Sequence, residues 1–255
     1  MKPLSEGLDD FSGESISLGS PSTPLEWFAS PRVILTGLIG FELLIVAAFL
    51  LDYWVGHPYE ALTRFINLDA EANLPAWFSS MQLFAAGLVA ALIGLSSRSK
   101  PVSRAAEDGW IWLTMAVIFL FLSMDEAAQF HELLGKVLSE RMSGTGLKHG
   151  FWIVVFLPAG LAALGFGIWL LPRLFPGSIQ ARICFVAGCL LIIIGSAGLE
   201  IVSYGLERSL NSASYILEVS IEELSEMTGG TLTLYALLLR LKIDGPAIGM
   251  EKKPT

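Results

Sequence analysis

Residues 109–132 have the sequence GWIWLTMAVIFLFLSMDEAAQFHE, an apolar run that ends in a group of ionisable side chains. Residues 109–128 are long enough to cross the hydrocarbon core of a bilayer, since about 20 helical residues at about 1.5 Å each span about 30 Å. The acids follow the apolar run without an intervening loop. We therefore predict a membrane-spanning helix whose last turn carries Asp125 and Glu126.

The composition of the whole chain supports the same interpretation. Of its 255 residues, 53% are hydrophobic and only 16% are charged, and the mean hydropathy is +0.62. A soluble domain is far less apolar. We predict an all-α fold, a multi-pass membrane bundle of six transmembrane helices in the plasma membrane of a bacterium. The predicted spans are residues 33–54, 74–97, 109–128, 151–171, 183–206 and 222–241.

The two ends of the chain differ from this bundle. Residues 1–31 are acidic and rich in Ser, Gly and Pro, which is typical of a disordered tail. A secretory signal would place basic residues before a short apolar stretch, so the first span is expected to remain as an anchor. We predict a transmembrane domain over residues 32–242 and a short C-terminal tail over residues 243–255.

The links between the predicted spans limit the possible functions. They are too short for a separate catalytic or nucleotide-binding domain, and no glycine-rich phosphate-binding motif is present. We therefore expect no nucleic-acid partner. Any chemistry is expected within the bundle or at its rim, with the lipid bilayer as its surroundings.

The distribution of Lys and Arg predicts the orientation of the bundle. With a cytoplasmic N-terminus, eleven of these residues fall in cytoplasmic segments and five in outer segments. Both termini are therefore predicted to be cytoplasmic. Fourteen carboxylates and all three histidines fall at the outer end, which is predicted to be strongly anionic.

Three of the acids are predicted to lie at one level inside the membrane. Counting from the cytoplasmic ends of their helices, Asp125, Glu200 and Glu226 lie roughly 24, 27 and 21 Å into a core of about 30 Å. A lone charged carboxylate in mid-membrane costs about 2.5–3.5 kcal/mol on insertion scales. These side chains are therefore expected to face inward and to be protonated, paired or bound to a cation.

The phase of a straight helix predicts which neighbours join them. On the third span, Asp125, Gln129 and Glu132 share a stripe, His131 reaches it from the side, and Glu126 lies on the other flank. On the sixth span, Glu222 and Glu226 share one face. These stripes predict a polar site formed by three helices.

Glu42 is a deeper charge. It lies ten residues after Arg32, roughly 15 Å into the bilayer and close to its midplane. One interpretation is a protonated carboxyl that makes a single interhelical hydrogen bond. The other is a step in a proton or ion relay that connects to the outer carboxylates.

Three functions are compatible with this pattern. The first is a metal-dependent membrane enzyme, such as a hydrolase acting on a lipid-like substrate, with a divalent metal ion as cofactor. Neither DExxxxHE nor EExxE specifies a metal, so its identity stays open. The predicted ligands are Asp125, His131, Glu132, Glu200, Glu222 and Glu226.

The second function is translocation of protons or cations, with Glu42 as the relay residue. The third is a structural or assembly role, in which the polar stripes bind a membrane-protein partner or a second copy of the chain. The two cysteines, Cys184 and Cys189, are interpreted as ordinary core thiols, because their spacing matches no redox motif.

Overall fold

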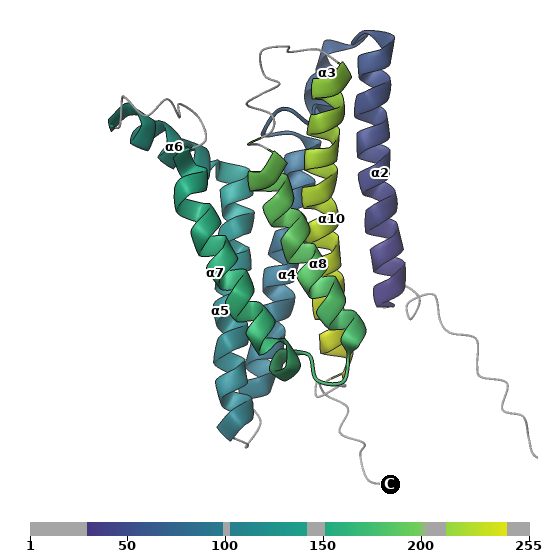
Figure 1. Ribbon diagram of the computed structural model, residues 1–255. Coiled ribbons are helices and arrows are strands. Elements are labelled where there is room, and N and C mark those ends of the chain that lie inside the picture. Colours follow the sequence, from purple (N-terminus) through teal and green to yellow (C-terminus); the bar gives the residue numbers. More distant parts are fainter. Residues whose placement is uncertain (1–29, 99–102, 142–150, 200, 202–212, 244–255) are drawn as a thin grey trace, which may run out of the picture.

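The computed structural model describes residues 30–98, 103–141, 151–199, 201 and 213–243, and these residues form helices and no strand. Figure 1 shows a bundle of long helices, with the short helices α3 and α6 at one end. The all-α prediction is confirmed. The elements are α2 (Pro31–Val55), α3 (Glu60–Ile66), α4 (Leu74–Arg98), α5 (Ser103–Ala128), α6 (Phe130–Arg141), α7 (Phe151–Leu174), α8 (Ile179–Ile193), the π-helix η1 (Ile194–Leu199) and α10 (Ala213–Ile243).

Five segments of the described chain are long and apolar enough to cross a membrane, which indicates a multi-pass membrane protein. They correspond to the first five predicted spans, although the structure begins or ends several of them a few residues away from the predicted limits. The prediction of six spans is therefore confirmed for five. The five segments are Pro31–Val55, Leu74–Arg98, Ala105–Ala128, Phe156–Leu174 and Ile179–Leu199.

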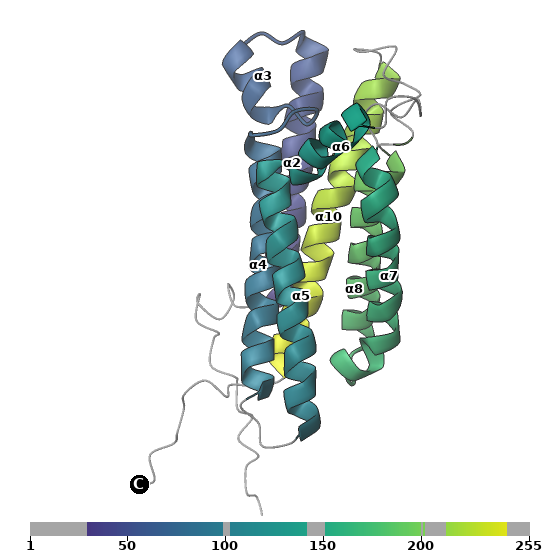
Figure 2. The same cartoon turned by 90° about the vertical axis from the view of Figure 1, so that its left-hand side faces the viewer.

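The sixth predicted span belongs to α10, which is a different kind of helix. It has 31 residues and carries four glutamates in its first half, so its composition does not place it among the five apolar segments. It contacts α2, α4, α8 and η1. Figure 2 shows it between the α4–α5 pair and the α7–α8 pair. Because these helices pack around α10, most of its polar side chains are buried or partly buried.

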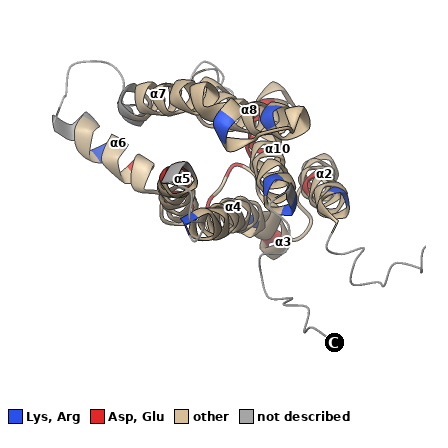
Figure 3. Cartoon of the chain, turned by 90° about the horizontal axis from the view of Figure 1, so that it is seen from below, with Lys and Arg blue, Asp and Glu red and all other residues tan. Residues whose placement is uncertain are grey.

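The two ends of the bundle differ in charge. Figure 3, seen from below, shows Lys and Arg on several helices at the end where α2 begins and α10 finishes. We call this the arginine end, after Arg98, Arg173, Arg182 and Arg240. We call the opposite end, which carries α3 and α6, the acidic end.

An apolar core fills the arginine end. The rings of Trp112 and Phe175 have centroids 5.4 Å apart, and those of Phe175 and Phe185 are 5.2 Å apart. All three side chains are buried, in a cluster that joins α4, α5, α7, α8 and α10. Burial of this apolar surface stabilises the bundle and closes it at this end.

Helices α8 and α10 approach each other so closely that their backbones are in contact. A Cβ atom added to Gly229 would lie 2.7 Å from the carbonyl oxygen of Gly188, and one added to Gly188 would lie 2.7 Å from that of Gly229. One turn nearer the acidic end, the side chain of Glu226 lies against Gly195 of η1. The face of α10 with Glu226, Gly229 and Thr233 is thus directed at α8 and η1.

Candidate functional site

The acidic end is organised around a break between α5 and α6. Gln129 has φ 55°, a left-handed conformation that ends α5 and starts α6 in a new direction. Asp125 stabilises this turn. Its Oδ1 accepts a 2.9 Å hydrogen bond from the backbone N–H of His131, and its Oδ2 lies 3.0 Å from Nδ1 of the same residue. Asp125 therefore orients the His131 ring.

This turn corrects the prediction based on a straight helix. The phase of a continuous helix separates Asp125 from His131 by 120°, whereas the break brings the two side chains into direct contact. The same break leaves Glu132 on α6, where it bonds Lys136 at 2.8 Å. Glu132 consequently lies at the edge of the site, close enough to Glu71 to repel its carboxylate.

Glu126, which the phase argument placed on a flank, is central. Its carboxyl interacts electrostatically with Glu71, Asp125 and His131. Glu223 and Glu226 of α10 interact with both Glu126 and Glu71. The link between α3 and α4, the end of α5 and the first half of α10 thus bring their acids together. We call this set the acidic cluster: Glu71, Asp125, Glu126, His131, Glu222, Glu223 and Glu226.

His131 is the basic member of the acidic cluster. Burial lowers its pKa, but the hydrogen bond with Asp125 and the negative charges of Asp125, Glu71 and Glu126 outweigh this effect, so the pKa is raised above 6.5. The surrounding carboxylates thus favour the imidazolium form.

Glu71 lies at the solvent-accessible rim. Although its side chain is exposed, the protein around the carboxyl partly excludes water and raises the pKa above 4.5. The positive charge of His131 and a hydrogen bond with Gln129 act in the opposite direction. Proton uptake by Glu71 is therefore favoured relative to a free carboxyl.

Both shifts predict that stability falls as the pH rises. A group whose pKa is higher in the folded state binds its proton more tightly there, so its contribution is complete below the unfolded pKa and is lost above it. For Glu71 the loss begins near 4.5, and for His131 near 6.5. The melting temperature of the purified protein, measured from about pH 4.5 to 8.5, should therefore decrease.

Asp125→Asn provides the control for this pH profile. The substitution removes the principal cause that raises the His131 pKa, so the part of the decrease above about pH 6.5 should become smaller. The part that begins near 4.5 should remain because Glu71 is intact. A melting temperature that rises over this range, or an Asp125→Asn profile identical to wild type, would contradict the assignment.

A second polar site lies around Glu42, deeper in the bundle. Glu42 is fully buried. Its Oε1 accepts hydrogen bonds from the Thr231 hydroxyl at 2.5 Å and from Gln82 Nε2 at 2.9 Å, and its Oε2 accepts one from the Thr228 hydroxyl at 2.9 Å. The sequence-based interpretation with one interhelical hydrogen bond is therefore too simple. Three donors from α4 and α10 hold this carboxyl.

Gln82 completes this site with an unused acceptor. Its Nε2 also donates to the Thr231 hydroxyl at 2.6 Å. Its Oε1 is buried and has no hydrogen-bond partner among the described residues. The Glu42 site therefore presents oxygen atoms of a carboxyl, an amide and two hydroxyls, which are the groups that bind protons or hard cations.

The six predicted metal ligands fall into three groups according to where the structure places them. Asp125, His131, Glu222 and Glu226 come together in the acidic cluster, Glu132 lies at its edge, and Glu200 lies outside the described residues. Within the described part of the chain, no group of three His, Cys, Asp or Glu side chains is placed to hold a metal ion.

Sequence reasoning missed three members of the acidic cluster. Glu71 lies in a link whose acids were interpreted as helix-start anions, and Glu126 and Glu223 each directly follow an acid that was selected. The available signal was the paired acids themselves. Two consecutive acids on a helix point in directions about 100° apart, so together they cover a wider sector than one stripe. This applies to Asp125 with Glu126 and to Glu222 with Glu223.

The fold and these sites define a multi-pass helical membrane protein with buried carboxylates. Residues 38–241 match the family model described as Domain of unknown function (DUF8692), and the chain belongs to that family. The matched region contains Glu42 and the whole acidic cluster. No curated protein and no solved structure matches the chain.

Proposed function

We propose that this protein translocates protons or small cations across a membrane, with the acidic cluster as the entry site and Glu42 as the relay. The observation that carries the proposal is the arrangement of polar side chains on α10. Glu222, Glu223 and Glu226 contribute to the acidic cluster, and Thr228 and Thr231 bind Glu42. The two sites are therefore consecutive along one helix.

The two sites lie at adjacent levels of α10. Thr228 follows Glu226 by two residues and Thr231 by five, which corresponds to about 3 and 7.5 Å along the helix axis. The two sites lie on different faces of α10, because Glu226 lies against Gly195 of η1 whereas Thr228 and Thr231 bind Glu42 of α2. A proton or small cation bound at Glu226 must therefore pass around α10, through water or polar side chains, to reach the Glu42 site.

The charges of the acidic cluster support cation binding. Glu126, Glu223 and Glu226 repel one another when ionised, and His131 can offset only one of the negative charges. Uptake of protons or cations relieves this repulsion. In the membrane, such buried carboxylates are characteristic of ion pathways.

The apolar core at the arginine end gives the pathway a direction. Trp112, Phe175 and Phe185 close the bundle on that side, whereas Glu71 of the acidic cluster is exposed at the opposite end. We infer that the acidic end faces the outside and that release to the cytoplasm requires this core to open. Such alternating access is the working principle of transporters.

Flux measurements in vesicles test the proposal. The purified protein is reconstituted into phosphatidylcholine vesicles, and an imposed pH gradient or Na⁺ gradient is followed with a pH-sensitive or Na⁺-sensitive dye. Protein-dependent dissipation of one gradient is expected. Vesicles that hold both gradients as long as protein-free vesicles would contradict the proposal.

A metal-dependent membrane hydrolase is the second candidate. The observation that favours it is the Asp125–His131 pair, because metal-binding histidines usually donate their second ring N–H to a carboxylate. Asp125 binds Nδ1, so Nε2 would be the coordinating atom. Glu126, Glu223 and Glu226 would supply the oxygen ligands only after moving closer together, because no three such side chains of the described residues are placed to hold a metal ion. The metal would then activate water for attack on a lipid-like substrate.

Elemental analysis of the purified protein tests this second candidate. The hydrolase predicts about one divalent metal ion per chain in wild-type protein, since a site with three or more ligands retains its metal through purification. Glu226→Gln should lose the metal, whereas Glu60→Gln, on α3 and exposed, should retain it. A stable wild-type protein without bound metal would exclude this mechanism.

A further inference from the structure

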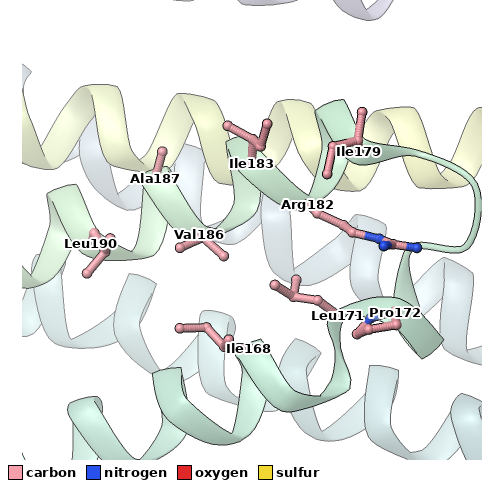
Figure 4. A pocket seen from close by; sticks show the side chains of 9 residues that line it. All are labelled: Ile168, Leu171, Pro172, Ile179, Arg182, Ile183, Val186, Ala187 and Leu190. Atoms are coloured by element: carbon pink, nitrogen blue, oxygen red, sulfur yellow. The ribbon is translucent and has the colours of Figure 1, made fainter.

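An open groove lies between α7 and α8 near the arginine end. It encloses about 480 Å³ and is lined by Ile168 and Leu171 of α7 and by Ile183, Val186 and Leu190 of α8. Figure 4 shows these side chains on the two facing helices. Ile168 and Ile183 are 45% and 60% exposed, so the groove opens onto the outer surface of the bundle.

One cationic side chain stands at the end of this groove. Figure 4 shows the guanidinium of Arg182 directed toward the turn that joins α7 to α8. Its Nε donates a 2.9 Å hydrogen bond to the carbonyl oxygen of Phe175, which fixes its position. Among the described residues, no carboxylate pairs with Arg182, in contrast to Arg173, which binds Glu107 and Asp108.

Arg182 lies near one end of a candidate membrane span, where the phosphate of a lipid is expected. It lies three residues after the start of α8, about 4.5 Å from the end of an apolar segment long enough to span the bilayer. The groove then runs from Arg182 to Leu190, about 12 Å, compared with about 15 Å for the hydrocarbon of one leaflet. A charged group at the membrane surface and an apolar channel beneath it match the two parts of a phospholipid.

We propose that this groove is a binding site for an anionic phospholipid. The phosphate binds the guanidinium of Arg182 through its remaining N–H groups, and one acyl chain lies between Ile168 and Leu171 on one side and Ile183 and Val186 on the other. The N-terminal end of α8 adds a partial positive charge next to the phosphate. Basic pockets between transmembrane helices recognise anionic headgroups in this way.

Native mass spectrometry of the purified protein tests the site. The protein is mixed with equal amounts of dioleoyl phosphatidylglycerol and dioleoyl phosphatidylcholine, which have the same acyl chains and differ in net charge. Wild-type protein should retain the anionic lipid in preference. Arg182→Gln should lower this preference about fivefold, because one basic residue near the surface contributes about 1 kcal/mol.

Three further variants separate the charge of Arg182 from other effects. Arg182→Lys keeps the charge and should retain most of the preference. Ala187→Trp fills the groove and should reduce the binding of both lipids. Arg98→Gln removes a cation from the same end, on α4 and stacked over Trp110, and should leave the preference unchanged.

Two results would overturn the proposal. One is equal retention of the two lipids by wild-type protein. The other is a preference lowered as much by Arg98→Gln as by Arg182→Gln, which would indicate only a general attraction of the basic end. Neither result depends on ion flux, so the lipid site and the proposed translocation can fail separately.

Discussion

Glu42→Gln is expected to reduce protein-dependent ion flux to the level of protein-free vesicles. The substitution keeps the size of the side chain and its ability to bind Thr228, Thr231 and Gln82, but an amide cannot exchange a proton or carry a negative charge. If Glu42 relays the ion, its bonded neighbours Gln82, Thr228 and Thr231 do not replace it, because none of them has a carboxyl group. The measurement is dye-reported flux in reconstituted vesicles.

Glu60→Gln provides a matched control for this experiment. It makes the same chemical change on the exposed helix α3, where Glu60 binds Arg64, and flux should remain at the wild-type level. Thr231→Val provides a graded variant, since it retains the carboxyl of Glu42 and removes one of its hydrogen-bond donors. Its flux should be reduced but measurable. Wild-type flux in Glu42→Gln would exclude the relay.

The folding state of Glu42→Gln can be measured in parallel. The amide leaves the buried position polar and hydrogen-bonded, so the melting temperature should stay close to that of wild type. Loss of flux in a protein with unchanged melting temperature assigns the effect to ion transfer. If Glu42→Gln loses both flux and thermal stability, Gln82→Glu is the variant to measure next. Its flux should differ from wild type if this site carries the ion.

Apolar length was sufficient to locate most of the bundle. The five apolar segments agree with predicted spans because about 20 apolar residues have few alternatives to a membrane helix. Hydropathy could not define α10, whose glutamates are compatible with the bundle because α2, α4 and α8 shield them. Such shielding depends on tertiary contacts and leaves no trace in local composition.

The acidic cluster was predictable in outline and not in its geometry. Depth along a helix correctly indicated that Asp125 and Glu226 belong to one region, since helix rise is constant. The contact between Asp125 and His131 depends on the left-handed conformation of Gln129. Non-glycine residues rarely adopt this conformation, so the sequence gives no reason to expect it at a glutamine. Glu71 reaches the cluster through a loop, and no helical periodicity applies there.

The hydrogen-bond donors to Glu42 were also beyond what the sequence could predict. Its depth predicted a buried carboxyl, which the structure confirms. Its donors, Gln82 and Thr231, lie 40 and 189 residues away along the chain, and only the packing of α2 against α4 and α10 brings them within hydrogen-bonding distance. The sequence therefore indicates that such a carboxyl needs partners and does not identify them.

Gly229→Ala is expected to destabilise the protein by about 1–3 kcal/mol, the usual effect of overpacking a close contact. The added Cβ would lie 2.7 Å from the carbonyl oxygen of Gly188 and 2.9 Å from the backbone nitrogen of Ile192. Both are backbone atoms, so a side-chain rotation cannot relieve the overlap and α8 must move away from α10. The melting temperature should fall by about 3–10 °C for a chain of this size.

Gly165→Ala is the matched control, because no atom lies within 4 Å of the added Cβ on α7. The same substitution should there be neutral or stabilising by up to about 1 kcal/mol, since alanine favours the helix more than glycine does. Gly188→Ala tests the contact from the other helix, where the new Cβ would meet the Thr233 side chain and the Gly229 carbonyl oxygen, and it should destabilise like Gly229→Ala. Equal melting temperatures for Gly229→Ala and Gly165→Ala would show that α8 and α10 do not touch as described. Since Glu226 lies against Gly195 on the same face of α10, the separation that destabilises Gly229→Ala should also disturb the acidic cluster and lower ion flux.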